Sequence, residues 1–189
     1  MKQNASSDML FVYLHGYKGS PISEKGKKLK KFLLKNYTDS KIYFPLMREN
    51  GMSSFKKLND FFNNENRNKI IIGSSFGGFL AHLLKQTRKD VKSVILINPV
   101  SRLDLLVQQE RFYDVRESAL RLYNLLPSQN SVLDDYLLLL QDDDNITPFE
   151  DAISFYKGAK CNIQSGQGHN YHQIEIVFKE ISSFINQYL

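Results

Sequence analysis

Residues 73–77 constrain this chain more than any other stretch, because an aliphatic run ends there and a helical pattern begins. Residues 69–72 contain three isoleucines in succession with no polar alternation, which predicts a buried strand. Residues 79–84 carry apolar side chains at helical spacing. The pattern between them, G-x-S-x-G, is typical of a nucleophile elbow, in which a serine lies on a tight strand-to-helix turn. Ser75 is therefore the first candidate for a nucleophile.

The two glycines of this pattern have a steric reason. At Gly73 and Gly77 the chain folds back so tightly that a Cβ atom would collide with it. The helix that follows offers free N–H groups, which suit a developing negative charge. A glycine turn can also serve packing or cradle a phosphate, but the stretch lacks both the dinucleotide and the P-loop spacing. A purely structural turn remains the alternative to the elbow.

Length, cysteine content and the N-terminus favour one cytoplasmic domain, which we place at residues 1–189. The single cysteine, Cys161, excludes an internal disulfide and fits a reducing compartment. It lies in an expected strand, so we predict a buried, inert thiol. The N-terminus lacks the apolar core and cleavage site of a secretory signal, and residues 9–14 are too few to span a bilayer. No stable membrane insertion is expected.

A net charge of +5 is mild, and six lysines between residues 25 and 35 account for much of it. These lysines surround an apolar stripe, so a solvated helix face explains them better than a nucleic-acid site. No aromatic side chains alternate with the lysines at a spacing suited to base stacking. We therefore expect no nucleic-acid partner.

Short aliphatic runs alternate with helical patterns along the chain, which predicts an α/β protein with a mainly parallel sheet and helices on both faces. In such sheets ligands bind beyond the carboxyl ends of the strands. The expected strands are residues 9–14, 41–44, 69–72, 91–97, 136–140 and 160–163, and the expected helices are residues 23–36, 53–63, 76–87, 148–156 and 171–189.

Residues 101–131 interrupt this alternation. Residues 103–106 and 112–126 are amphipathic and helical in pattern, with no strand between them. An insertion after the fourth strand would lie over the functional edge of the sheet, so we predict a small helical cap that shapes a pocket. The alternative is an extra pair of helices packed on the flank of the sheet.

A serine hydroxyl needs an adjacent base to become a nucleophile, and the base needs a third group to orient it. His169 is the preferred base, because it lies in a glycine-rich loop that leaves the last expected strand. His172 is the reserve candidate. His82 falls within the helix after the elbow, where it packs or faces solvent. His15 follows the first strand and is expected to brace a loop rather than to carry a proton.

Three consecutive aspartates, residues 142–144, compete for the orienting role. We choose Asp144, and the order Ser75, Asp144, His169 is that of the α/β-hydrolases, serine then acid then histidine. The aspartates could instead bind a divalent cation, but the D-x-[DN]-x-[DN]-G pattern of a calcium loop is absent. A solvated turn is the alternative for Asp142 and Asp143. Neither a metal nor an organic cofactor is expected.

An oxyanion hole needs two N–H donors near the developing negative charge. The backbone N–H of Phe76, directly after the serine, is one candidate. The other should come from the exit of the first strand, where Gly16 permits a close backbone approach and Tyr17 is the chosen donor.

Several motifs resemble the YqiA-type esterases, a family of small bacterial α/β-hydrolases. They are Tyr-Leu-His-Gly-Tyr at residues 13–17 with Ser-Pro at residues 20–21 and Lys25, Ile-Gly-Ser-Ser-Phe-Gly-Gly-Phe at residues 72–79, Ile-Asn-Pro at residues 97–99, Leu-Leu-Gln at residues 139–141 with Asp144, and Gly166 with His169. The resemblance covers nearly the whole chain. It implies an α/β-hydrolase fold with esterase or acyl-thioesterase activity, and Ser75, Asp144 and His169 match the triad positions. Asp143 replaces a family glycine, and residues 101–131 match poorly, which bears on substrate choice.

These observations predict a serine hydrolase that cleaves small carboxylic esters or thioesters, acyl-CoA among them, through an acyl-enzyme on Ser75. A C–C bond hydrolase or an acyltransferase with the same triad is the alternative within this fold. A binding module whose triad-like residues no longer catalyse is the alternative outside enzymes.

Overall fold

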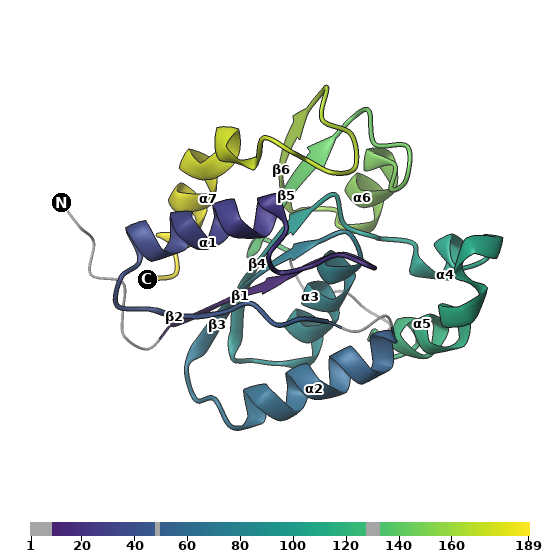
Figure 1. Cartoon of the computed structure of the whole chain (residues 1–189), viewed down its shortest axis with the longest axis horizontal. Helices are drawn as coiled ribbons and strands as arrows, with labels where there is room; N and C mark the ends of the chain where they lie inside the picture. The colour runs from purple at the N-terminus through teal and green to yellow at the C-terminus, as the bar shows by residue number, and fades with distance from the viewer. Residues whose placement is uncertain (1–8, 48–49, 128–132) are drawn as a thin grey trace.

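The computed structural model describes residues 9–47, 50–127 and 133–189. Within them, six parallel strands form one sheet in the order β2-β1-β3-β4-β5-β6 (Figure 1). Every predicted strand is present, with ends shifted by at most two residues. The strands are β1 (Met9–Leu14), β2 (Lys41–Tyr43), β3 (Asn68–Ser74), β4 (Val91–Ile97), β5 (Tyr136–Gln141) and β6 (Lys160–Gln164).

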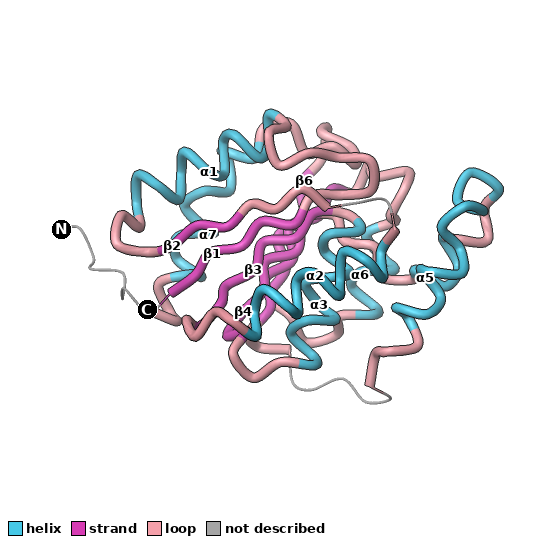
Figure 2. Tube along the Cα trace, turned by 60° about the horizontal axis from the view of Figure 1, so that its bottom comes forward, coloured by secondary structure: helices cyan, strands magenta, loops and turns pink. Residues whose placement is uncertain are grey.

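Helices cover both faces of the sheet and make three layers, as predicted (Figure 2). One face packs against α1 (Glu24–Asn36) and α7 (Phe178–Ile185). The other packs against α2 (Gly51–Asn63), α3 (Phe76–Thr87) and α6 (Phe149–Phe155). The predicted α/β class is therefore confirmed.

The strands are apolar throughout because both of their faces are buried. In β1, Leu10 and Val12 belong to the core under α2 and α3, whereas Phe11 and Tyr13 belong to the core under α1 and α7. All four are at most 2% exposed. Unbroken apolar runs are what parallel strands between two helical layers require.

Side-chain caps mark the starts of two helices, α1 and α2. The Ser23 side chain accepts a hydrogen bond from the Gly26 N–H, as expected for a cap directly before α1. Helix α2 begins two residues earlier than predicted, because the Asn50 side chain caps it through the Ser53 N–H.

The predicted helix over residues 171–189 is wrong in length. Tyr171 has a φ of 49°, a left-handed conformation that cannot continue into a helix. A short 3-10 turn, η2 (Ile174–Val177), follows and leads into α7. The apolar pattern over this region was correct, but its first residues serve the loop that carries His169.

Cys161 corrects a second expectation, because its side chain is exposed. It lies on β6, which is the last strand of the sheet and has a neighbour on one side only. Ile163, two residues on, is 44% exposed. The short helix α6 thus leaves this face of the edge strand uncovered. Position at a sheet edge cannot be inferred from one strand's own sequence.

Residues 101–127 form α4 (Leu103–Leu106), the 3-10 segment η1 (Glu110–Val115) and α5 (Arg116–Tyr123). The single helix expected over residues 112–126 is therefore divided between η1 and α5. These elements lie to one side of the sheet, at the right of Figure 1. The last part of the predicted cap, residues 128–131, lies outside the described residues. No helix in the described part of the chain is long and apolar enough to cross a membrane.

Candidate functional site

Ser75 lies on the turn between β3 and α3 in a strained conformation, with φ 54° and ψ −120°. Its backbone is held on both sides: its N–H donates to the Ile97 carbonyl at 3.0 Å, and its carbonyl accepts from the N–H groups of Gly78 and Val100 at 2.9 and 3.1 Å. Non-glycine residues with such dihedral angles are sparse and persist only where the surroundings hold them. The turn presents the Ser75 side chain at the carboxyl edge of the sheet.

Both glycines of the pentad allow close backbone approaches. A Cβ on Gly73 would lie 2.4 Å from the Gly77 carbonyl oxygen, and a Cβ on Gly77 would lie 2.1 Å from that of Leu14. Leu14 is the last residue of β1 and pairs with Gly73 across the sheet. The elbow is therefore built against the exit of β1.

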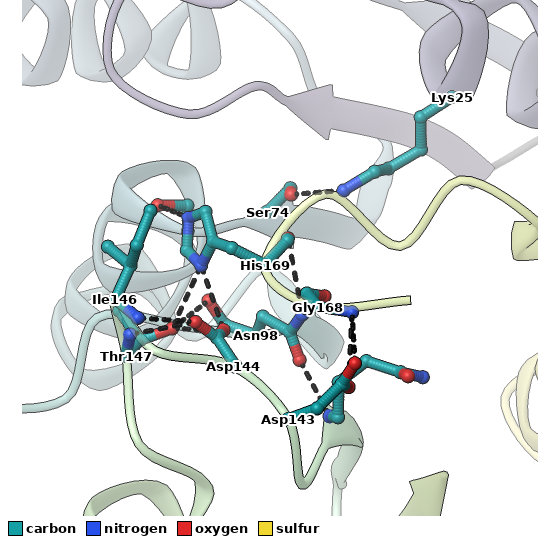
Figure 3. Close-up of polar contacts among 11 residues, drawn as sticks. Lys25, Ser74, Asn98, Asp143, Asp144, Ile146, Thr147, Gly168 and His169 are labelled. Atoms are coloured by element: carbon teal, nitrogen blue, oxygen red, sulfur yellow. Dashed lines mark hydrogen bonds and ion pairs between the residues drawn. The ribbon is translucent and has the colours of Figure 1, made fainter. Parts of the chain in front are cut away.

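Asn98 anchors the loop that carries His169. Its side-chain N–H group donates to the carbonyls of Gly168 and His169 at 3.0 and 3.2 Å, and its side-chain oxygen accepts from the Gln141 N–H at 3.0 Å (Figure 3). Asn98 thereby ties the ends of β4 and β5 to the loop after β6. Gly168, with a φ of 53°, makes the turn that leads into His169.

A continuous chain of hydrogen bonds links three of the predicted site residues. The Ser75 Oγ lies 2.9 Å from the His169 Nε2, and the His169 Nδ1 lies 2.8 Å from the Asp144 Oδ2. An ionised carboxylate can only accept, so the proton of a neutral imidazole lies on Nδ1. Nε2 is then free to accept the Ser75 hydroxyl proton. The structure thus brings together the nucleophile, base and acid candidates.

Several donors hold the Asp144 carboxylate, whose side chain is 1% exposed. Oδ1 accepts from the backbone N–H groups of Ile146 and Thr147 at 2.8 and 3.0 Å, and Oδ2 accepts from the Thr147 hydroxyl at 2.7 Å (Figure 3). Burial raises the pKa of Asp144, but the hydrogen bonds from His169, Thr147 and Ile146 outweigh it, and the net pKa lies below its usual value. Asp144 is therefore charged at neutral pH.

The two preceding aspartates are engaged elsewhere. Asp143 accepts from the Gly168 N–H at 3.1 Å, and Asp142 accepts from the Ser165 hydroxyl at 2.5 Å. Both side chains brace the loop before His169 rather than contact its imidazole. Among the described residues, no group of three or more histidines, cysteines, aspartates or glutamates is placed to hold a metal ion.

The predicted oxyanion donors lie beside Ser75. A Cβ built on Gly16 would approach the Ser75 Cβ to 3.1 Å, so the β1 exit loop runs directly past the serine. Tyr17 and Phe76 both line the cavity next to Ser75. Neither backbone N–H has a hydrogen-bond partner within the described ranges. Donors left open at this point can bind a substrate oxygen.

Among the described residues, none of the other histidines forms a hydrogen bond with the Ser75 hydroxyl. The buried His15 ring accepts from the Met47 N–H at 2.9 Å and donates to the Gly16 carbonyl at 2.8 Å, and burial lowers its pKa. His82 is fully buried and contacts the Tyr136 hydroxyl at 3.0 Å, and desolvation lowers its pKa to about 3. Of the two alternatives stated for His82, packing is the one observed. His172 lies before η2 rather than inside a helix. Its backbone carbonyl accepts a hydrogen bond from the Lys28 Nζ at 3.0 Å.

Two cavities flank the hydrogen-bonded pair Ser75 and His169, and both residues line each of them. One cavity of about 360 Å³ is apolar and extends under α4, η1 and α5. The other, of about 390 Å³, lies between the β1 exit and α1 and is lined by polar side chains. The apolar lining includes Val100, Leu103, Leu106, Val107, Phe112 and Ala119. The polar lining includes His15, Ser20, Ser23, Lys25 and Ser74.

Three residues of this site were not assigned a role from the sequence. Asn98 was interpreted as the end of a strand and as part of a resemblance motif, although an asparagine at a strand exit, with a φ of 41° here, is a recognisable loop-anchoring position. The sequence gives no sign of a role for Thr147, because the hydrogen bond from its hydroxyl to Asp144 depends on the turn between the two residues. Lys25 belongs to the motifs that carry the resemblance, but its charge was grouped with the solvated lysines of its helix, and no periodicity separates it from them.

Comparison with known proteins supports both the fold and the family. The Butyrivibrio proteoclasticus protein Est1E, with ferulic acid bound, superposes with a TM-score of 0.72 at 16% identity, over 99% of this chain and 92% of that one. The Pyrococcus furiosus esterase Pf2001 superposes with a TM-score of 0.69 at 16% identity, over 96% of this chain and 82% of that one. Mouse alpha/beta hydrolase domain-containing protein 10 superposes with a TM-score of 0.73 at 13% identity, over 95% of this chain and 90% of that one. Identities this low establish the shared α/β-hydrolase fold alone. Residues 10–186 match the family described as Uncharacterised protein family (UPF0227), the YqiA-like family, and the chain therefore belongs to it.

Proposed function

We propose that this protein is a serine hydrolase that cleaves carboxylic esters or thioesters through an acyl-enzyme on Ser75. One observation carries the proposal: the 2.9 Å and 2.8 Å contacts that run from Ser75 through His169 to Asp144. A hydroxyl, an imidazole and a buried carboxylate in this order are the parts that nucleophilic acyl transfer requires.

In the proposed reaction, Ser75 Oγ attacks the carbonyl carbon while His169 Nε2 takes the hydroxyl proton. The tetrahedral intermediate collapses when the bond to the leaving group breaks, and His169 returns the proton to the leaving oxygen or sulfur. Water then attacks the acyl-enzyme by the same proton route and releases the acid. Asp144 keeps the proton on Nδ1 and stabilises the imidazolium that forms.

The N–H groups of Phe76 and Tyr17 are proposed to bind the developing oxyanion, each contributing roughly 3 kcal/mol of transition-state stabilisation. Gly16 and the buried His15 would hold the loop that carries Tyr17, through the His15 bonds to Met47 and Gly16. The apolar cavity beside Ser75 suits an acyl group. Est1E, which shares the fold and binds ferulic acid, supports a small carboxylic acid derivative as the substrate.

A fluorophosphonate probe tests the proposal, because only an activated serine displaces its fluoride. We expect stoichiometric labelling, and peptide mapping should place the label on Ser75. Ser75→Ala should abolish labelling, and His169→Ala should slow it greatly, since the base is lost. A folded protein that takes no label would instead support the binding-module alternative, and a label on Ser74 would mean that the elbow is misassigned.

Separate replacement of the two neighbouring aspartates tests the acid. Asp144→Asn should lower kcat for p-nitrophenyl butyrate by roughly 10³- to 10⁴-fold, because an amide no longer holds the imidazole in the required tautomer. Asp143→Asn should retain most of the activity, since the amide oxygen can still accept the Gly168 N–H. Initial rates at saturating ester, with circular dichroism to confirm folding, decide the matter. A large loss at Asp143 alone would refute the assignment of Asp144.

A further inference from the structure

Lys25 departs from the other lysines of α1, because its side chain enters the polar cavity. Its Nζ donates to the Ser74 Oγ at 2.9 Å, one residue before the candidate nucleophile (Figure 3). The same cavity is lined by Ser75 and His169. A lysine on the first turn of a surface helix thus places its ammonium group beside the reacting centre.

Among the residues that the structure describes, no carboxylate forms an ion pair with the Lys25 ammonium, and the charge of Asp144 acts on it without direct contact. Glu24, which also lines the cavity, pairs with Lys27 at 2.8 Å instead. Burial lowers the pKa of Lys25 to about 8, with the charge of Asp144 opposing this, so the group stays mostly protonated at neutral pH.

An ammonium has three donors, and the hydrogen bond that Lys25 makes within the described residues goes to the neutral Ser74 hydroxyl. Holding a charged group away from water without a counter-charge costs free energy. Such a group is favourable in a binding site if a ligand supplies the missing negative charge. The polar cavity, which Lys25 lines, is where such a ligand would meet its ammonium.

The two cavities divide the space around Ser75 by polarity. A bound ester extends from its carbonyl carbon in two directions, as an acyl group and as a leaving group. The apolar cavity suits the acyl group, so the polar cavity is left for the leaving group. Two other cations, Lys18 and Arg111, lie at the apolar cavity, but both are exposed and rest on the rings of Tyr17 and Phe112.

We propose that the polar cavity is the leaving-group site and that Lys25 there binds an anionic group, a carboxylate or a phosphate, of the substrate's leaving portion. The inference rests on the proposed function and names the substrate class for the same site. Ser75 Oγ forms the new bond to the carbonyl carbon, and the bond from that carbon to the leaving oxygen breaks. His169 delivers the proton, and the departing alcohol keeps its anionic group on Lys25 until it diffuses away.

Two esters with the same acyl group and closely similar leaving groups test this proposal. 3-Butyryloxybenzoate carries a carboxylate, and 3-butyryloxybenzamide is its neutral counterpart. The wild-type protein should have the higher kcat/KM for the benzoate. Lys25→Met should lower the ratio of the two kcat/KM values by roughly 10- to 100-fold, the range expected for a hydrogen bond to a charged group. Lys25→Arg should keep part of the preference, because it keeps the charge.

Two further variants serve as matched controls. Lys31→Met removes one charge from an exposed position on the same helix and should leave the ratio unchanged. Ser74→Ala removes the partner hydroxyl but keeps the ammonium, so the preference for the benzoate should persist. An equal loss for both esters in Lys25→Met would mean that Lys25 acts only on the elbow. Loss of the preference in Arg111→Met instead of Lys25→Met would move the anion to the apolar side. Either result overturns the inference.

Calorimetry separates this inference from the proposed function. Titration of the Ser75→Ala variant with 3-hydroxybenzoate and 3-hydroxybenzamide measures leaving-group binding without turnover. We expect tighter binding of the benzoate, and this preference should disappear when Lys25→Met is added. Binding that shows this pattern in a protein that hydrolyses neither ester would refute only the proposed function. Turnover with no preference for the anion, in rate or in binding, would refute only the inference.

Discussion

Replacing Ser75 by alanine should lower kcat/KM for p-nitrophenyl butyrate by roughly 10⁵-fold, whereas Ser74→Ala should retain substantial activity. The two serines are adjacent, but their side chains have different partners. The Ser75 Oγ contacts the His169 Nε2 at 2.9 Å, and the Ser74 Oγ contacts the Lys25 Nζ at 2.9 Å. Only Ser75 has a base within reach, so only its hydroxyl can become the nucleophile.

The pair of variants also controls for folding. Both remove one hydroxyl from neighbouring positions at the end of β3 and add no atom, so both variants should fold. Initial rates should be measured over a range of ester concentrations, with urea unfolding followed by circular dichroism. Equal losses of activity in two folded variants would show that catalysis depends on the turn as a whole and that Ser75 is not the nucleophile.

Much of the fold could be predicted because each strand of the central sheet is buried on both faces. The apolar runs at residues 9–14 and 136–140 mark strands without help from neighbours. Features that depend on the whole assembly could not be predicted in this way. Cys161 is exposed because β6 ends the sheet, and the helix expected from Tyr171 begins later because that residue completes the loop before it.

The candidate site shows the same division. Ser75, Asp144 and His169 each follow a parallel strand, and parallel strands bring their carboxyl ends to one edge. Their meeting could therefore be anticipated from topology. Lys25 instead lies on the first turn of α1, and the orientation of its side chain depends on how that helix packs over β1. A pattern of lysines around an apolar stripe contains no information about which lysine turns inward.

Gly77→Ala should destabilise the fold by at least about 4 kcal/mol or prevent folding, although it adds a single methyl group. The added Cβ would lie 2.1 Å from the Leu14 carbonyl oxygen and 2.6 Å from that of His15. Both atoms are backbone at the end of a central strand, so neither can move aside as a flexible side chain could. Relief would require α3 to shift away from β1 and would displace Ser75 from the loop that carries Tyr17.

Gly158→Ala is the matched control for this prediction. Gly158 has a φ of 98°, but a Cβ there would meet nothing within 4 Å. Its replacement should therefore cost only the backbone strain, about 1–3 kcal/mol. Urea unfolding measured by circular dichroism compares the two variants on one scale. If Gly77→Ala unfolds no more easily than Gly158→Ala, the elbow does not press against the exit of β1, and the oxyanion assignment of Tyr17 loses its structural basis.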